Sequence, residues 1–317
     1  MPAFVFRPPS KGANVAELNP VLVKELRGRM RGGRSFVLLT IFLALLAGAT
    51  LLFYGVIASQ TGNDLNAGRQ IGQALFLMIA FAALVGVSII TPSLTAGALA
   101  GERERQSFDL LLASQLSPWQ IVLGKLGSAL AFALLIVISV LPLMSIAFLF
   151  GGVSLTEMAI ALVGLVMTAL LYASVGLFWS GVMRSTLAAN GLAIGSVALI
   201  LLGIPFLALL ASIASSFSSD LWAGSAVSAT LTRLFLSFHP FIALGLTEAA
   251  IQNGEGAFFL RTELSDGSTI WLPQFWLMFT GLALLASALL LVLTTRQLQP
   301  ERAEREGRGR RKRTAAE

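Results

Sequence analysis

Six long apolar segments divide this chain and limit what it can fold into. They cover about 36–57, 71–98, 121–149, 158–181, 186–213 and 275–295, and Lys125 is the one charged residue inside them. Each segment exceeds the roughly 20 residues that a helix needs to cross a bilayer. Only 12% of all residues are charged, about half the share of a soluble domain. The sequence therefore predicts an all-α membrane protein with six transmembrane helices, forming one transmembrane domain over 35–295.

The basic residues indicate how this domain is oriented. If both termini lie on one side, all but three of the 22 Lys and Arg residues lie on that side, the exceptions being Arg69, Arg233 and Arg261. Positive charge is retained on the cytoplasmic face of membrane proteins. We therefore expect a multi-pass protein of the cell (inner) membrane with cytoplasmic N- and C-termini and a basic cytoplasmic tail over 296–317. Because the charges lie at chain ends and in short connections, we expect a lipid bilayer as partner and no nucleic acid.

An external segment over 214–274 precedes the last span in this arrangement. Its part 220–247 is apolar, but a span there would bury Arg233 and would place the basic tail on the outer side. Large apolar side chains recur at helical spacing, at Phe235, Phe238, Phe241 and Leu244. This pattern favours a short helix that is either re-entrant or interfacial, and the sequence leaves the two open.

The end of the external segment has the pattern of a β-hairpin. Residues 258–264 and 269–272 flank the turn-forming sequence Ser265-Asp266-Gly267-Ser268. Two short apolar runs around such a turn pair as antiparallel strands. Trp271 and Trp276 lie where an aromatic belt at the membrane surface would lie. We therefore expect this part of the chain to anchor the outer face.

Residues 1–34 form a basic cytoplasmic segment before the first span. Leucines four residues apart share one face of a helix, and arginines cover the rest of its surface. This pattern predicts a helix on the inner leaflet, whereas the alternative is a solvated basic tail. The residues that define the helix are Leu18, Leu22, Leu26, Arg27, Arg29 and Arg31.

The connection between the second and third spans carries the most distinctive pattern. A charged turn precedes an apolar stripe, and Ser117-Pro118 begins the next helix. The pattern predicts a short amphipathic helix over 102–118. Taken alone, it favours docking in a groove of another protein and lying on the bilayer surface equally. Its defining residues are Glu102, Arg103, Glu104, Arg105, Phe108, Asp109, Leu111, Leu112, Leu116 and Pro118.

The run Gly101–Lys125 resembles the first cytoplasmic connection of ABC-2-type transporter permeases. The shared features are the charged cluster, the Leu-rich helix, the Leu116-Ser117-Pro118 turn and the run 121–125 that opens the third span. The run 19–27, Asn-Pro-Val-Leu-Val-Lys-Glu-Leu-Arg, is similar to the start of such permeases, and so is the plan of six spans. The chain departs from the family at Gln106-Ser107, where a Gly-Thr pair is usual.

The resemblance implies a permease subunit of an ATP-driven ABC exporter. Residues 102–118 would be the coupling helix that contacts a separate nucleotide-binding ATPase subunit, and a second permease chain, identical or related, would complete the membrane part. ATP and Mg would be bound by the ATPase partner. The chain itself has no phosphate-binding loop, because Gly124-Lys125 is followed by Leu126 and Trp119 replaces the first glycine. We expect no catalytic, cofactor-binding or metal-ligating residues in it.

Two other classes of function are weighed against this one. An ion-coupled secondary transporter is the alternative, although such carriers keep ionisable groups within their spans and these spans hold only Lys125. An intramembrane enzyme would need a cluster of catalytic or metal-ligating side chains on the spans. Three polar residues in the spans, Thr168, Tyr172 and Asn190, either line a pathway or bond between helices, and packing is the default. The substrate is not predicted.

Overall fold

A computed structural model of the chain describes residues 20–30, 33–61, 67–108, 116–217, 226–263 and 267–314. Within these ranges, six helices are long and apolar enough to cross a membrane, namely α2, α3, α5, α6, α7 and α10. This confirms the predicted all-α membrane fold. The elements in chain order are α1 (Pro20–Met30), α2 (Gly33–Thr61), α3 (Ala67–Glu104), α5 (Pro118–Leu149), α6 (Leu155–Val182), α7 (Thr186–Phe217), α8 (Ala226–Leu236), α9 (Pro240–Gln252), β1 (Phe259–Glu263), β2 (Thr269–Pro273) and α10 (Phe275–Thr314).

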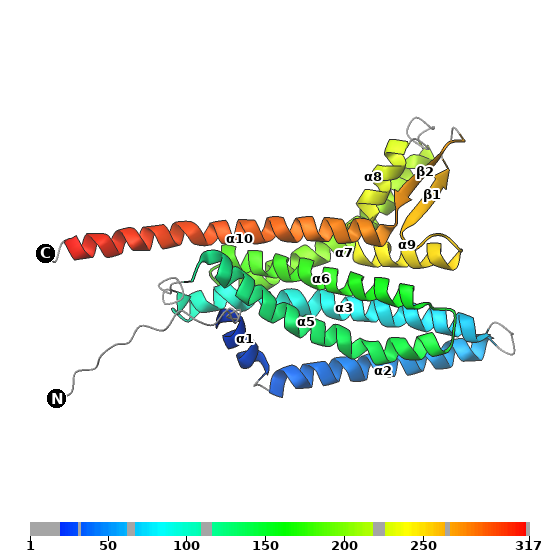
Figure 1. Cartoon of the computed structure of the whole chain (residues 1–317), viewed down its shortest axis with the longest axis horizontal. Helices are drawn as coiled ribbons and strands as arrows, with labels where there is room; N and C mark the ends of the chain where they lie inside the picture. Colours follow the sequence, from blue (N-terminus) through cyan, green and yellow to red (C-terminus); the bar gives the residue numbers. More distant parts are fainter. Residues whose placement is uncertain are drawn as a thin grey trace, which may run out of the picture.

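The long helices lie side by side and give the bundle two distinct ends (Figure 1). The α1 end holds α1, the C-terminal end of α3 and the N-terminal end of α5. The hairpin end holds α9, β1 and β2, together with the first turns of α3 and α6.

Helices α3 and α6 form the centre of the bundle. In their most apolar windows, 56% of the α3 residues and 67% of the α6 residues are buried. A Cβ atom at Gly176 of α6 would overlap the Pro92 carbonyl oxygen and the Thr95 hydroxyl of α3. Small residues permit such close backbone approach in membrane bundles, where dispersion contacts drive helix association. Glycine at position 176 therefore sets the closeness of the central helix pair.

Helices α2 and α7 lie at the periphery. Only 11% of the α2 window and 17% of the α7 window is buried. The side chains of Leu52 and Leu202 are 76% and 73% exposed, which is stable in hydrocarbon but unfavourable in water. These surfaces fit the lipid-facing sides of a membrane bundle.

In the described part of the apolar stretch 220–247, α8 is followed by the beginning of α9, so this part is not one continuous helix. Helices α8 and α9 are bent by 120° relative to each other around Ser237 and Phe238, so they do not form one straight crossing helix. His239 caps α9, its Nδ1 accepting a hydrogen bond of 3.1 Å from the Ile242 N–H. Its Nε2 lies 3.1 Å from the Leu201 carbonyl oxygen of α7. The elbow between α8 and α9 is thus tied to α7.

The predicted hairpin is confirmed. Strands β1 and β2 pair antiparallel, with Arg261 opposite Trp271. Beyond it, Gln274 Nε2 donates a 2.7 Å hydrogen bond to the Gly256 carbonyl oxygen, and the indole of Trp276 donates one of 2.7 Å to the Ala257 carbonyl oxygen. The hairpin is therefore fixed to the start of α10.

Several helices extend beyond the bounds predicted from apolarity. Helix α6 begins at Leu155 because Ser154 and Glu157 form a reciprocal capping box. Helix α3 continues to Glu104, so 102–104 belong to the second span's helix and not to a separate coupling helix. Helix α10 continues to Thr314 through the predicted basic tail, since extending an existing helix avoids the cost of nucleation.

Candidate functional site

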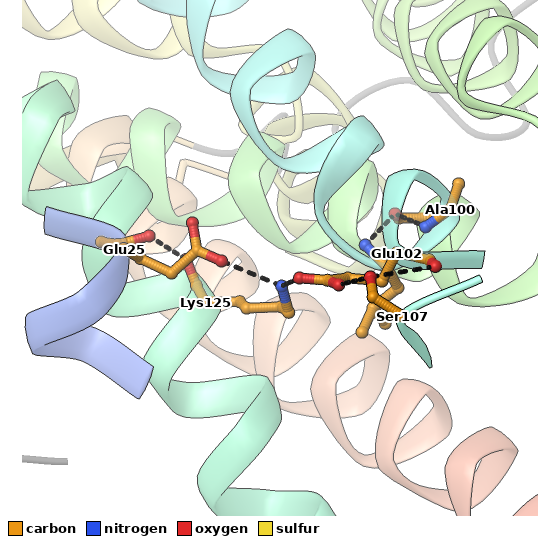
Figure 2. Close-up of polar contacts among 8 residues, drawn as sticks. Glu25, Ala100, Glu102, Ser107 and Lys125 are labelled. Carbon is orange, nitrogen blue, oxygen red and sulfur yellow. Dashed lines mark hydrogen bonds and ion pairs between the residues drawn. The ribbon is translucent and has the colours of Figure 1, made fainter. Parts of the chain in front are cut away.

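A buried lysine joins three helices at the α1 end (Figure 2). Lys125 of α5 is 2% exposed, and its Nζ lies 3.0 Å from a carboxylate oxygen of Glu25 in α1 and 3.5 Å from one of Glu102 in α3. A buried ammonium without partners is strongly unfavourable, whereas paired carboxylates compensate for its lost hydration. We call Glu25, Glu102 and Lys125 the Lys125 cluster. It fixes α1 and α3 against the start of α5.

Apolar packing of α1 brings Glu25 to this cluster. Val21 is buried, and the Leu22 side chain lies against Gly127 of α5, where an added Cβ would be only 3.1 Å from it. Leu26 is half-buried, and Arg27 is exposed. One face of the predicted surface helix thus contacts protein. The described parts of the chain do not include Leu18, Arg31 or the side chain of Arg29.

The structure shows how Gln106 and Ser107 form the turn after α3, where ABC-2-type permeases usually have a Gly-Thr pair. Gln106 has φ of +57°, the left-handed conformation that favours glycine. Its N–H donates to the Arg103 carbonyl at 3.1 Å, and the Ser107 N–H donates to the Glu102 carbonyl at 3.0 Å, which is the Schellman pattern of a helix C-terminus. The Ser107 hydroxyl also donates to the Glu102 carboxylate. Serine therefore supplies a hydroxyl at this turn, and glutamine adopts the glycine conformation.

Arg103 ties the end of α3 to the connection between α6 and α7. Its guanidinium donates hydrogen bonds to the carbonyl oxygens of Gly181, at 2.6 Å, and Met183, at 3.1 Å. The same guanidinium lies 4.7 Å from the centroid of the Phe108 ring, a cation–π distance. This contact places Phe108 beneath the charged turn.

Glu104 extends this attachment to α7. Its carboxylate accepts hydrogen bonds from the Thr186 N–H at 2.8 Å and the Thr186 hydroxyl at 2.9 Å. Thr186 is the first residue of α7, so a negative charge lies at a helix N-terminus, where the macrodipole favours it. Arg103 and Glu104 together fix the beginning of the predicted coupling segment to α6 and α7.

The remaining predicted contact residues are divided between core and surface. Phe108 is 6% exposed and packs with Leu99, Ile121 and other apolar side chains of α3, α5, α6 and α10. Arg105 is exposed, and Leu116 is half-buried. Pro118 occupies the first turn of α5 behind the Ser117 cap. The predicted contact residues Asp109, Leu111 and Leu112 lie outside the described residues.

The three polar residues of the spans lie on two helices, Thr168 and Tyr172 one turn apart in α6 and Asn190 in α7. Thr168 is fully buried and donates to the Gly164 carbonyl of its own helix at 2.7 Å. Tyr172 is also fully buried and packs with apolar residues of α7, α9 and α10. Asn190 lies half-buried in the first turns of α7. The Tyr172 hydroxyl is buried without a hydrogen-bond partner among the described residues.

The sequence interpretation missed the partners of Lys125 and one further polar contact. A lysine two turns inside an apolar helix signals a buried counter-charge, and Glu25 is the single acidic residue of the basic segment 19–31. Ser180 gave no such signal, because a serine in an apolar helix is common. Its hydroxyl accepts hydrogen bonds from the backbone N–H groups of Leu99 at 2.8 Å and Ala100 at 3.0 Å.

These features define a multi-span helical membrane protein in which the end of the second span's helix, together with Phe108, is fixed to α5, α6, α7 and α10. Residues 59–291 match the model of a protein family described as ABC-2 family transporter protein. The match covers well over half of the 317 residues, and the chain belongs to this family. The resemblance inferred from residues 101–125 is thereby confirmed. No curated protein matches the chain in sequence.

Proposed function

We propose that this chain is the permease subunit of an ATP-driven exporter and that the segment 105–118 contacts a separate nucleotide-binding ATPase subunit. Membership of the ABC-2 family supports a transport role. The observation that carries the proposal is the attachment of the end of α3 to the rest of the bundle. ATP and Mg bind to the partner, and the chain contributes movement rather than catalysis.

The contacts at the α1 end support a mechanical role for the segment. A force on Arg105, which is exposed, reaches α5 through Glu102 and Lys125. It reaches α6 through Arg103 and α7 through Glu104. Rigid-body movement of packed helices is how transporters convert a small displacement at one site into a change of access. Closure of two ATPase subunits would therefore move several spans together.

A second permease chain completes the pathway in this proposal. The centre of the single bundle is tightly packed, with the Thr168 and Tyr172 side chains fully buried. The peripheral helices α2 and α7 instead expose apolar side chains. Both observations favour a substrate pathway between two chains over one within a single chain. We also propose a location in the cell membrane with both termini cytoplasmic, supported by the distribution of basic residues.

Co-purification with the ATPase subunit tests the proposal. A tagged permease chain should retain a nucleotide-binding subunit whose ATP hydrolysis is stimulated in the complex. The double variant Arg105→Glu and Asp109→Lys should lower the affinity of the two subunits at least about tenfold, because it reverses charges at the contact. Arg261→Glu, an exposed charge reversal at the hairpin end, is the matched control and should retain the partner.

Unchanged retention and stimulation in the double variant would contradict the assigned contact.

A separate screen identifies the substrate class. Compounds that stimulate ATP hydrolysis by the purified complex are candidates, because a transported compound stabilises one of the two access states. A protease-protection experiment that placed the C-terminal tail outside the cytoplasm would contradict the proposed orientation.

A further inference from the structure

Two buried carboxyl groups meet at the hairpin end. Glu157 lies in the first turn of α6, Glu248 lies in α9, and each is 5% exposed. Both side chains line one small cavity between α3, α6 and α9. Two carboxylates buried beside each other without a cation destabilise each other's charged form. One of the two groups therefore keeps its proton.

The two groups differ in their surroundings. Glu157 accepts a hydrogen bond from the backbone N–H of Ser154 in the capping box of α6. Glu248 accepts one from the Gln252 amide at 2.9 Å, and burial raises the pKa of its carboxyl. The proton is therefore placed on Glu248.

Among the described residues, no positive side chain lines the cavity beside the pair, and its other lining residues are not titratable. Where α10 meets α9, the contact is a neutral hydrogen bond from the Trp276 N–H to the Thr247 hydroxyl at 3.1 Å. The other charged or titratable groups on these elements near this end, within the described residues, are Arg69, His239 and Glu255. Arg69 and Glu255 are exposed, and His239 lies at the opposite end of α9.

We propose that Glu157 and Glu248 share a single proton and that this proton holds the C-terminal half of α9 against α6, which makes the contact sensitive to pH. Loss of the proton to water leaves two adjacent negative charges, and their repulsion separates α9 from α6. The N-terminal half of α9 stays anchored, since Leu244 packs against Gly164 and Phe241 against Phe81. The inference does not rest on the proposed transport function.

The direction of the pH effect follows from the burial of Glu248. Burial raises the pKa of the Glu248 carboxyl to about 7, above its ordinary value of 4.5. A group whose pKa is raised in the docked state favours docking at acidic pH and opposes it as the pH rises. The contact should thus be closed below about pH 6 and loosened above about pH 8.

Cysteine labelling of the purified full chain measures this loosening, because the chain has no native cysteine. Ala250 of α9 is buried and its neighbour Ala249 is exposed, so Ala250→Cys reports the separation and Ala249→Cys reports the intrinsic reactivity of the thiol. Between about pH 5.5 and about pH 8.5, the ratio of the two maleimide labelling rates should rise roughly tenfold. Detergent solution exposes both ends of the bundle to the same pH.

Glu248→Gln separates titration of the pair from other effects. Glutamine can donate to Glu157 without titrating, so the labelling ratio should stay low and flat with pH in this background. Glu263→Gln, an exposed carboxyl on β1, is the control and should keep the full rise. A flat ratio with native Glu248, or an equal rise in Glu248→Gln, would overturn the proposal. Difference infrared spectroscopy gives a second measurement without cysteines: the carbonyl band of a protonated carboxyl should disappear as the pH rises, and its absence at acidic pH would also overturn it.

Discussion

The two ends of the bundle hold buried charges in opposite ways. At the α1 end, the ammonium of Lys125 lies between two carboxylates, which are themselves about a quarter exposed. At the hairpin end, Glu157 and Glu248 are both buried, and no cation is among the described residues that line their cavity. Opposite charges attract each other and form a joint, whereas two buried carboxyl groups side by side depend on a proton. A rigid joint suits the end that we propose contacts the ATPase, and a titratable contact suits an end that we propose opens with pH.

Removal of the central cation should have the largest effect on this contrast. Lys125→Met leaves Glu25 and Glu102 facing each other and should destabilise the chain by about 3 kcal/mol, near the lower limit for breaking a buried ion pair because the carboxylates are partly exposed. Thermal unfolding in detergent measures the change. The control is Lys24→Met at an exposed position one residue before Glu25. Equal unfolding temperatures for Lys125→Met and the native chain would show that the cluster is not a joint.

The pH dependence of stability should distinguish the hairpin end. Because the folded-state pKa of Glu248 is about 7, its destabilising effect is absent at low pH and grows as the pH rises to that value. The native chain should lose roughly 2 kcal/mol between about pH 5 and about pH 8 relative to Glu248→Gln. Unfolding temperatures of the two chains across this range test the difference. If the unfolding temperatures of the two chains change in parallel with pH, Glu248 does not contribute the expected pH dependence, and the contrast between the two ends is wrong.

A smaller effect is expected at Ser180, which links α6 to α3 near the Lys125 cluster. Ser180→Ala removes the acceptor of two buried N–H groups and should cost about 1–2 kcal/mol. Ser174→Ala on the same helix is the matched control, because the Ser174 hydroxyl only donates to the Leu170 carbonyl of its own helix. If both substitutions lower the unfolding temperature equally, the hydrogen bonds from α3 to Ser180 add no more stability than the hydroxyl of Ser174 does within its own helix.

The smallest effect should be a gain in stability at the turn after α3. Gln106 has a positive φ, which a residue with a side chain adopts at a cost. Gln106→Gly should therefore stabilise the chain by about 0.5–1 kcal/mol. Gln120→Gly, in the first turn of α5 where a capping box forms, should instead destabilise it. A loss of stability in Gln106→Gly would show that the glutamine side chain makes a contact that outweighs the backbone cost.

The sequence predicted the spans better than the polar sites, for a physical reason. An uninterrupted apolar run is a local signal, so α2, α3, α5, α6, α7 and α10 were all predicted from it. The sequence predicts the helix ends less well, because apolarity alone places a charged residue such as Glu157 or Glu102 beyond the helix. Each of these carboxylates instead finds a hydrogen-bond partner within or beside the helix. Capping and pairing therefore extend helices into charged sequence.

Contacts between distant residues could not be predicted in this way. Glu25 and Lys125 are 100 residues apart in the sequence. Glu157 and Glu248 are separated by a similar number of residues. Single-sequence patterns contain no information on which helix lies beside which. From the sequence alone, the apolar side chain of Phe108 could belong to a docking surface or to the core. The packing of α3, α5, α6 and α10 around it shows that it is buried.

Site-specific cross-linking to the ATPase subunit tests the central claim most directly. Because the chain has no cysteine, Arg105→Cys and Arg261→Cys each present a single exposed thiol, the first after α3 and the second at the hairpin end. We expect a short thiol-to-amine cross-linker to join the ATPase subunit to the Arg105→Cys chain in membranes and not to the Arg261→Cys chain. Cross-linking at position 261 without cross-linking at position 105 would contradict the account.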